Sequence, residues 1–557
     1  MDNIHTDWFK DAVIYQIYPR SYMDSDNDGF GDINGIISKL DYLKDLGINC
    51  IWLSPIYDSP QEDNGYDISN YKDIYKPFGS LEDAKRMIQE MHKRGIRVIM
   101  DLVVNHTSSE HPWFKSAIAD VNSPYRDYYI IRRGKNKGKK PPTNWGAFFG
   151  GSTWERIGNT EDYYLHLFTK GQPDLNWENE KVREEVKSIL KFWLDLGVDG
   201  FRCDVITLIS KKQTFKSSFP MIALTGKSNF VNGPRLHEFL HELYKDVYAR
   251  YDCMTVGETV LSSLNDAVLL TSPSREELSM IFNFDNVDVD GFFGVKWFKR
   301  KFSLRRWKRI YKKWQLGLED KGWNSLFIEN HDQRRSVGRF GTTEGEYRVE
   351  SSKSLAATYF LMHGTPFIYQ GQEIGMGNPH FKELSDFKDV ETHNINGLLQ
   401  RVKPLKLLLS KERLFEYSRD NTRTPMLWDD SIYGGFSQVE PWIKPNPDKR
   451  FNVKSALENK DSLYYFYKSL INIKKEYEAV KQGKYIPLYM NDSKVFAYER
   501  RSEDESLVII SSFSNKEVKR KWLSNYSDYQ LLLSNYDEHS PDSLKPYETR
   551  IYFKKTR

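Results

Sequence analysis

The chain has 557 residues, and 81 lysine and arginine residues against 77 aspartate and glutamate residues leave a formal net charge of only +4. This balance argues against a nucleic-acid binder whose affinity depends on bulk charge. At roughly 150 residues per domain, the length predicts three or four domains or a single barrel with insertions. Aromatic residues make up 14 % of the chain; their rings suit sugar ligands, although filling the core is the first explanation.

Short β-rich apolar runs alternate with longer segments of helical period through the first two-thirds of the chain. Eight such runs predict eight parallel β/α units, and therefore an α/β fold with a closed (β/α)8 TIM barrel. The predicted strands cover residues 12–18, 48–53, 97–104, 199–204, 253–258, 280–284, 325–330 and 366–369, and the clearest helices cover 35–46, 81–94, 180–196, 234–251 and 350–362.

Two segments do not fit the barrel pattern. The stretch after the third strand is rich in Gly, Pro, Asn, Lys and aromatic residues, and its length predicts an inserted subdomain over the barrel mouth. Its basic run is interpreted as a solvated turn. Short alternating strands after residue 482 predict a C-terminal antiparallel β-sandwich domain. The predicted domains are 1–104 (barrel, first part), 105–176 (inserted subdomain), 177–481 (barrel, second part) and 482–557 (β-sandwich).

Carboxylates end several predicted strands, where a barrel of this type places its active site. Arg202 and Asp204 share one side of the fourth strand, so a fixed cation is expected to keep Asp204 ionised as a nucleophile. Glu258 ends the fifth strand and, in a less polar environment, would keep a proton to donate. Asp332 follows the seventh strand and could stabilise positive charge. Each acid alone has an ordinary explanation as a surface or ion-paired group, but paired carboxyls ~5 Å apart are what retaining cleavage of a glycosidic bond requires.

The same residues carry a family resemblance. Segments 101–106 (DLVVNH), 200–205 (GFRCDV), 256–258 (VGE) and 330–332 (NHD) resemble, in order and spacing, the four motifs of the α-amylase superfamily, glycoside hydrolase family 13. Together with 172–177 (QPDLNW), they resemble the branch of oligo-1,6-glucosidases and α-glucosidases. The similarity runs from residues 12–20 to 418–425 and beyond.

The resemblance implies a retaining exo-acting α-glucosidase that releases glucose from α-1,6-linked isomaltose and short isomalto-oligosaccharides. Asp204 would be the nucleophile that forms a covalent glucosyl intermediate, Glu258 the acid/base and Asp332 the transition-state stabiliser. Asp67 would act with Arg419 on the hydroxyls of the terminal glucose, with Arg423 as a less favoured partner. The implied substrate-binding residues are Tyr66, Asp67, His106, Phe149, Phe168, Gln172, Arg202, Val205, His331 and Arg419.

Other activities use the same residues. Val205 matches members that prefer α-1,6 bonds, whereas Thr207 and Arg334 depart from the Asn and Pro common in the branch. Segment 286–290 lacks the arginine-rich loop of sucrose isomerases. The alternatives are an α-glucosidase for α-1,4 bonds, sucrose or trehalose 6-phosphate, a glucosyl transferase or isomerase, and a non-catalytic sugar-binding or transporter-associated barrel. Residues that could face a phosphate, although a solvated loop is favoured, are Lys296, Lys299, Arg300 and Lys301.

An acidic loop near the N-terminus resembles the first part of an EF-hand. Asp24, Asp26, Asp28 and Asp32 occupy loop positions 1, 3, 5 and 9, with a glycine at position 6 and the carbonyl of Phe30 at position 7. Position 12 is a glycine rather than the usual bidentate glutamate, so a structural site is expected rather than a sensor. Four crowded acids repel one another unless a cation bridges them. The pattern predicts a bound Ca²⁺ ion, as the resemblance also implies, because many members of the family bind Ca²⁺ in this loop. Mg²⁺ is the alternative ion.

Cysteine usage and the N-terminus indicate the compartment. Cys50, Cys203 and Cys253 show no spacing typical of a disulfide framework or a zinc site. The first eight residues lack the basic and apolar segments of a signal peptide, and no apolar stretch approaches about 18 residues. We therefore expect a cytoplasmic monomer with a small oligosaccharide substrate, and no membrane or nucleic-acid partner.

Overall fold

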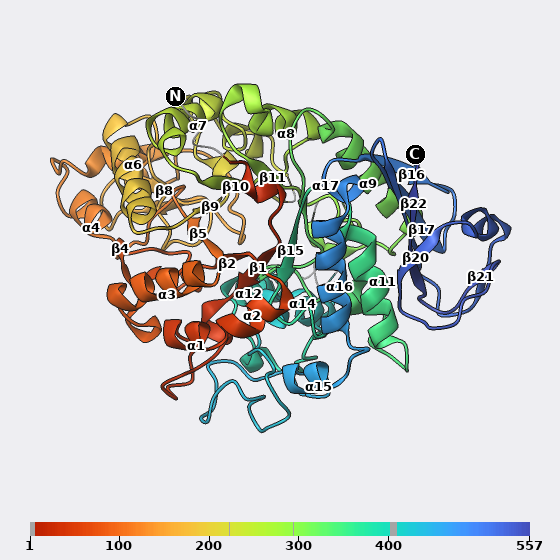
Figure 1. The fold of residues 1–557 in the computed structure, drawn as a ribbon. Coiled ribbons are helices and arrows are strands. Elements are labelled where there is room, and N and C mark those ends of the chain that lie inside the picture. The colour runs from red at the N-terminus through yellow and green to blue at the C-terminus, as the bar shows by residue number, and fades with distance from the viewer. Residues whose placement is uncertain (1–5, 222, 293–294, 402–408, 557) are drawn as a thin grey trace.

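Eight parallel strands form a barrel at the centre of the computed structural model, which describes residues 6–221, 223–292, 295–401 and 409–556 (Figure 1). The order of the strands around the sheet is β11-β10-β9-β5-β2-β1-β15-β14. A parallel bridge between Ile281 and Asn324 brings the two edges together and closes the barrel. The predicted TIM barrel is confirmed. Its strands are β1 (Ile14–Ile17), β2 (Cys50–Leu53), β5 (Arg97–Leu102), β9 (Gly200–Cys203), β10 (Met254–Glu258), β11 (Met280–Phe282), β14 (Ser325–Leu326) and β15 (Thr365–Tyr369).

Helices cover the outside of the barrel by burying one apolar stripe each. In α3 (Leu81–Lys93), Ser80 and Asp83 form a capping box, and the buried residues Ala84, Met87, Ile88 and Met91 follow the helical period. The segment predicted as one helix over 35–46 is instead two, α1 (Ile33–Ser38) and α2 (Leu40–Leu46), because the backbone leaves helical geometry at Lys39. The other covering helices include α6 (Glu180–Asp195), α7 (Leu236–Asp246), α8 (Leu264–Thr271), α9 (Leu304–Leu318), α11 (Arg348–Phe360) and α16 (Leu463–Glu476).

A small antiparallel sheet lies within the segment predicted as an insertion. Its order is β6 (Ile131–Arg133), β8 (Asp162–Leu165) and β7 (Trp154–Arg156), and α4 (Pro112–Ala119) precedes it. Bridges from His106 to Asp174 and from Tyr129 to Leu175 connect the two ends of this segment. The insertion is therefore held close to the end of β5, where it can contribute side chains to the barrel mouth.

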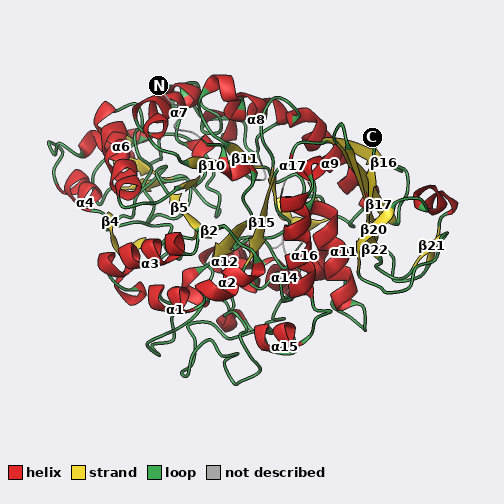
Figure 2. Cartoon of the chain, in the orientation of Figure 1, coloured by secondary structure: helices red, strands yellow, loops and turns green. Residues whose placement is uncertain are grey.

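The C-terminal region is an antiparallel sheet, as predicted (Figure 2). Residues of β17 alternate between its two faces. Phe496 and Tyr498 join the main core, whereas Val495 and Ala497 pack with Val518 of the small second sheet. The five strands are, in order, β16 (Lys484–Leu488), β17 (Val495–Arg501), β18 (Glu505–Ser512), β22 (Thr549–Lys555) and β20 (Gln530–Ser534), and the second sheet pairs β19 (Val518–Lys519) with β21 (Ser543–Leu544).

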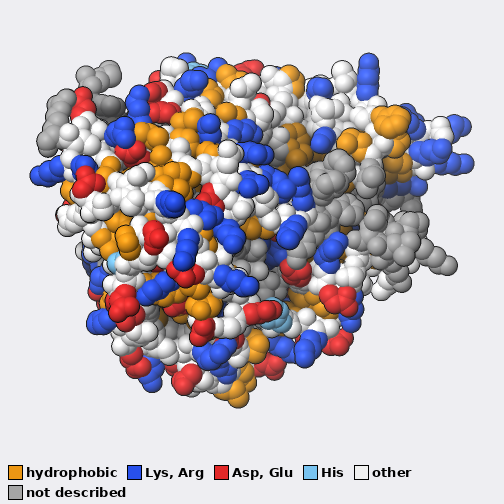
Figure 3. Space-filling model, turned by 90° about the vertical axis from the view of Figure 1, so that its right-hand side faces the viewer, with side chains coloured by type: hydrophobic (Ala, Val, Ile, Leu, Met, Phe, Trp, Pro, Cys, Tyr) orange, Lys and Arg blue, Asp and Glu red, His pale blue; other side chains and the backbone are white. Residues whose placement is uncertain are grey.

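The charge on the surface and the hydropathy of the helices agree with the amino-acid composition. On the face shown in Figure 3, basic and acidic side chains lie interspersed, in keeping with the small net charge. Among the residues that the structure describes, none of the helices combines the length and apolar character that a membrane crossing requires.

Candidate active site

One buried guanidinium joins the ends of three neighbouring strands. Arg202 of β9 places Nη1 2.6 Å from Asp101 Oδ1 of β5 and 2.5 Å from Oδ1 of Asp204, which directly follows β9. Its Nη2 lies 2.8 Å from Glu258 Oε2, at the end of β10. The indole of Trp52 donates a hydrogen bond to Asp101 Oδ2 at 2.9 Å. The structure thus brings the proposed nucleophile and the proposed acid/base onto one cation.

The three carboxyls share a single positive charge, and the pKa values of two of them, Asp204 and Asp101, are raised. Burial raises the pKa of Asp204 well above its usual range; Arg202 acts in the opposite direction, and the charge of Glu258 raises the pKa further. Burial also raises the pKa of Asp101 to about 6. Burial therefore opposes the expected effect of Arg202 on Asp204, and it is the larger influence on the pKa of this carboxyl.

The residue after Asp204 holds Glu258 through its backbone. The amide of Val205 donates a hydrogen bond to Glu258 Oε2 at 3.1 Å. Val205 has a φ of 36°, a left-handed conformation that is costly for a β-branched residue and is typical of functional sites. Its side chain packs in an apolar cluster with Leu208 and Phe230. The strained turn therefore orients the acid.

The third acid lies beside two arginines. Asp332 Oδ1 accepts a hydrogen bond from Arg423 at 2.6 Å and lies 3.5 Å from Arg419 Nη1. The neighbouring His331 places Nε2 2.8 Å from the hydroxyl of Tyr66, and the two rings stack with centroids 5.4 Å apart. Burial lowers the pKa of His331 to about 3, so this imidazole is neutral at physiological pH. Arg423, the less favoured partner for the terminal sugar, is thus the closer of the two arginines to Asp332.

The partner expected for Arg419 is corrected. Asp67 does not reach Arg419; its carboxylate accepts hydrogen bonds from Ser59 Oγ and from the amides of Glu62 and Asp63, at 2.9–3.1 Å. Asp67 therefore stabilises a turn, and burial raises its pKa to about 6. Asp63 instead places Oδ1 2.9 Å from Arg419 Nη2. The acid that pairs with Arg419 is Asp63, four residues before the predicted one.

The remaining predicted residues connect the insertion to this cluster. Gln172 Nε2 lies 3.2 Å from Asp63 Oδ2 and 3.2 Å from His106 Nε2. Phe168 packs against His106 with centroids 5.2 Å apart. The ring of Phe149 lies 4.9 Å from the guanidinium carbon of Arg419. Contacts thus link the predicted substrate-binding residues to one another, and Asp67 is linked only through its turn, by the amide of Asp63.

Sequence reasoning missed three acids of this site, Asp63, Asp101 and Asp389. Asp389 accepts hydrogen bonds from Arg419 Nε and Nη2 at 3.0 and 2.7 Å. Its segment offers no motif, so no signal could have found it. Asp101 begins the motif at residues 101–106, and the alternation of side chains along a strand could have placed it inside the barrel. For Asp63, the signal is the Asn64-Gly65 turn, in which both residues have a positive φ.

The acidic loop gathers three of its predicted ligands. One carboxylate oxygen from each of Asp24, Asp26 and Asp28 lies within 4.8 Å of the others. Burial raises the pKa of Asp26, and the nearby acids, Asp28 foremost, raise it further. Asp32 points elsewhere: it caps α1 by accepting from the amide of Gly35, and it also accepts from Ser25. Three clustered carboxylates are the hard oxygen donors that Ca²⁺ takes.

The possible phosphate-facing residues give little support to that role. The side chains of Lys296 and Lys299 lie outside the described residues. Arg300 and Lys301 are exposed, and the described contact of Arg300 is a hydrogen bond from its amide to the carbonyl of Asp290. Thr207, the other departure from the branch, is buried.

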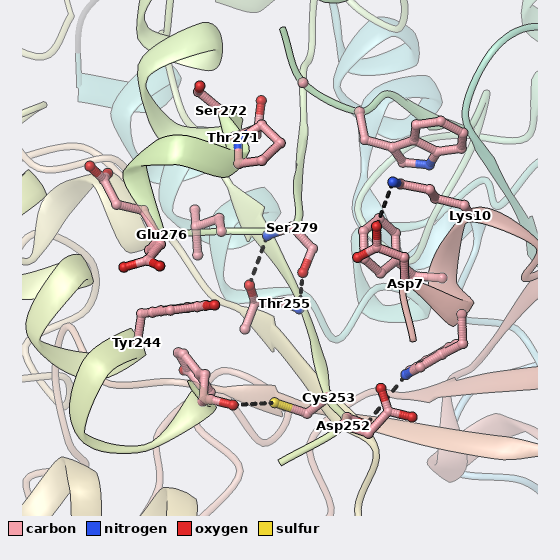
Figure 4. A pocket seen from close by; sticks show the side chains of 18 of the residues that line it. Asp7, Lys10, Tyr244, Asp252, Cys253, Thr255, Thr271, Ser272, Glu276 and Ser279 are labelled. Atoms are coloured by element: carbon pink, nitrogen blue, oxygen red, sulfur yellow. Dashed lines mark hydrogen bonds and ion pairs between the residues drawn. The ribbon is translucent and has the colours of Figure 1, made fainter. Parts of the chain in front are cut away.

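A separate cavity of about 490 Å³ lies at the opposite end of the barrel (Figure 4). There, Thr255 of β10 and Ser279 before β11 each donate an amide hydrogen bond to the other's hydroxyl. Asp252 and Cys253 precede β10, whereas Glu258 ends it. No predicted catalytic residue is among the described residues that line this cavity, so it is distinct from the candidate active site.

Comparison with known proteins finds relatives that match nearly the whole chain. The model "Alpha amylase, catalytic domain" matches residues 16–483. The oligo-1,6-glucosidase of Parageobacillus thermoglucosidasius is 49 % identical, with 98 % of each chain covered. The trehalose-6-phosphate hydrolase of Bacillus licheniformis superposes with a TM-score of 0.91 at 43 % identity, covering 98 % of this chain and 99 % of that one. The isomaltulose synthase of Klebsiella sp. LX3 superposes with a TM-score of 0.92 at 38 % identity and the same coverage.

Proposed function

The chain belongs to the α-amylase catalytic-domain family of glycoside hydrolases, and on this premise we propose that it is a retaining exo-acting oligo-1,6-glucosidase. Its substrates are isomaltose and short isomalto-oligosaccharides, from which it releases the terminal glucose. The observation that carries the proposal is the contact of Asp204 and Glu258 with the single guanidinium of Arg202. Two carboxyls that contact one guanidinium support the proposal that both act on one anomeric carbon.

Hydrolysis proceeds in two displacements. In the first, a carboxylate oxygen of Asp204 attacks the anomeric carbon while Glu258 gives its proton to the departing glycosidic oxygen, and a glucosyl ester of Asp204 forms. In the second, Glu258 takes a proton from water, and the water oxygen displaces Asp204. Asp332 stabilises the positive charge that develops on the sugar ring.

Arg419, Asp63 and Phe149 support the exo mode. The ion pair of Asp63 with Arg419, covered by the ring of Phe149, would bind the hydroxyls of a terminal glucose and close the pocket beyond it. Asp389 holds the same guanidinium from another side. Internal sugars of a longer chain would then be excluded, so that glucose is the product.

A panel of sugars tests the proposal. Isomaltose, maltose, sucrose, trehalose and trehalose 6-phosphate are supplied separately, and glucose release is measured. We expect isomaltose to give the highest kcat/KM and NMR to show α-glucose as the first product. Faster turnover of maltose would refute the role of Val205, and preference for trehalose 6-phosphate would assign the activity of the Bacillus licheniformis neighbour. Formation of isomaltulose from sucrose would indicate an isomerase, and release of no glucose a binding protein.

We also propose that Asp24, Asp26 and Asp28 hold a structural Ca²⁺ ion, with the Phe30 carbonyl as a further ligand and Mg²⁺ as the alternative. Asp32 supports the loop through its cap on α1. The ion would cancel repulsion among the acids, and no step of hydrolysis passes through it. A chelator should lower the unfolding midpoint much more than the initial rate. Asp26→Asn should abolish the effect of the chelator, and calorimetric titration with Ca²⁺ and Mg²⁺ identifies the ion.

The protein is further proposed to act as a cytoplasmic monomer. Cys50, Cys203 and Cys253 all lie in the described ranges, and none forms a disulfide, which suits a reducing compartment. Light scattering during size-exclusion chromatography should give a mass near 65.6 kDa, and a doubled mass would contradict the monomer.

A further inference from the structure

Arg334 joins three segments at the barrel mouth. It follows Asp332 by two residues, and its side chain is only 5 % exposed. Its Nη2 lies 2.5 Å from Asp290 Oδ2, in the loop after β11. Its Nη1 forms an ion pair with Glu416, and the guanidinium carbon lies 3.9 Å from the centroid of the Tyr417 ring. A single buried side chain therefore connects segments that are distant in the sequence.

The barrel side of this connection is fixed by a second arginine. Arg339 Nη2 lies 2.5 Å from the other carboxylate oxygen of Asp290. Arg339 also donates to the side-chain oxygen of Gln333 at 2.8 Å, the residue between Asp332 and Arg334. Both carboxylate oxygens of Asp290 thus pair with guanidiniums, one from Arg334 and one from Arg339.

The other side of the connection leads directly to the sugar-binding arginine. Glu416 and Tyr417 end α14 (Lys411–Tyr417), two residues before Arg419. Asn421 Nδ2 donates to the carbonyl of Glu416 at 3.0 Å and keeps this turn compact. Arg419 in turn lies 3.5 Å from Asp332. The contacts therefore form a closed ring that passes through Asp332, Arg334, Glu416 and Arg419.

We propose that Arg334 is a positioning residue that locks the Asp332 loop to the segment carrying Arg419, so that both side chains face the same glucose ring. The inference rests on the proposed function, because it takes Asp332 and Arg419 as sugar-binding groups. Displacement of a reacting or binding group by about 1 Å can cost ~10²-fold in rate.

A matched pair of variants separates positioning from stability. Arg334→Met removes the charge and keeps most of the side-chain volume. Arg348→Met is the control, because Arg348 is similarly buried, pairs with Asp448 at 2.6 Å and lies 3.6 Å from the ring of Phe451, outside the candidate site. Both variants should lower the unfolding midpoint. At a temperature where both are folded, only Arg334→Met should lower kcat/KM for isomaltose, by about 10-fold or more.

A double-mutant cycle identifies the group that is positioned. In an Arg419→Ala background, Arg334→Met should cost less than about 3-fold, because no guanidinium is left to hold. Glu416→Gln, a milder change at a half-exposed residue, should lower kcat/KM by about 3-fold in the wild type; it replaces Arg334→Met if that variant does not fold.

Two results would overturn the proposal. One is an equal loss of kcat/KM in Arg334→Met and Arg348→Met. The other is a loss of kcat/KM in the double variant at positions 334 and 419 that equals the product of the two single-variant losses. Failure of the proposed function is distinguishable, because it appears in the wild type as preference for another sugar in the panel. The variants are then compared on that preferred sugar. If no sugar is hydrolysed, the comparison uses calorimetric affinity for isomaltose.

Discussion

Buried cations occur both at the barrel mouth and at the contact between the barrel and the C-terminal sheet, but their partners differ. At the mouth, Arg202 contacts Asp101, Asp204 and Glu258. At the domain contact, Arg500 of β17 donates to the carbonyls of Leu361 and Gly483, at 3.0 and 2.6 Å. Both guanidiniums are almost completely buried. One region therefore collects negative charge around a cation, and the other surrounds a cation with neutral dipoles.

The pKa values show what this difference means. Burial acts to lower the pKa of Arg202, but the surrounding carboxylates outweigh it and raise the pKa well above the usual range. Burial lowers the pKa of Arg500 to about 10, because carbonyl dipoles offset less of the desolvation. Lys308 of α9 likewise donates to three carbonyls of the C-terminal region, and burial lowers its pKa to about 8. At the domain contact, the buried cations donate their hydrogen bonds to neutral carbonyls. At the barrel mouth, three carboxyls contact the single charge of Arg202.

The largest expected effect comes from removing the nucleophile at the mouth. Asp204→Asn should lower kcat by roughly 10⁴-fold or more, because no glucosyl ester can form. The unfolding midpoint should stay unchanged or rise, since one of three crowded acids is lost. Asp199→Asn is the control: Asp199 pairs with Arg97 at 3.1 Å at the opposite end of the barrel, and its loss should affect stability without comparable loss of rate. Retained activity in Asp204→Asn would refute the assigned role.

The second-largest effect is expected from removing the proposed acid/base, Glu258, and its size depends on the leaving group of the substrate. Glu258→Gln should lower kcat for isomaltose by about 10³-fold, because the glutamine cannot protonate the departing oxygen. A nitrophenyl α-glucoside needs little protonation, so formation of its glucosyl ester should slow much less. Burst kinetics with the two substrates measure this difference. Equal losses on both substrates would show that Glu258 does not act as the acid.

A pair of variants tests whether Asp63, rather than Asp67, is the acid that acts with Arg419. Asp63→Asn should lower kcat/KM by about 10²-fold, because the charge that faces Arg419 and the substrate is lost. Asp67→Ala should instead cost about 1–3 kcal/mol of unfolding free energy, because the hydroxyl and amides of its turn lose their acceptor. Steady-state kinetics and denaturant unfolding of both variants provide the measurements. The reverse pattern would restore Asp67 as the pocket acid.

A smaller effect is a shift of the pH profile. The negative charge of Asp101 raises the pKa of Asp204, so Asp101→Asn should lower that pKa. Because Asp204 must be ionised to attack, the ascending limb of kcat/KM against pH should move to lower pH, by about one unit or less. The side-chain carbonyl of the introduced asparagine can still accept from Trp52, which preserves the packing. Movement of the limb to higher pH would contradict the shared-charge interpretation of the mouth.

The smallest effect is expected at the domain contact. Lys308 binds fewer protons in the folded state than in the unfolded state between pH about 8 and its ordinary pKa of 10.5. Its contribution therefore makes the unfolding free energy rise with pH in this range. Lys308→Met should flatten the rise, whereas Lys313→Met, at a half-exposed lysine, should not. Unfolding curves at several pH values measure the slopes, and equal slopes in wild type and Lys308→Met would exclude this effect.

The barrel and the main acids could be predicted from the sequence because both depend on local patterns. Short β-rich runs fix the strands, as at 48–53 against the observed Cys50–Leu53, and acids at strand ends must meet at one end of a barrel. The choice between Asp63 and Asp67 could not be made, because it depends on a turn that points one carboxylate inward and the other into the loop. Asp389 reaches the site only through long-range packing, and the raised pKa of Asp204 depends on burial that no local pattern contains.

The backbone contact of Val205 makes the position of Glu258 independent of the side chain at residue 205. Since the peptide N–H, and not the isopropyl group, reaches Glu258, exchange of this side chain leaves the grip on the acid in place. Proline alone would abolish the contact outright, because it has no N–H to offer.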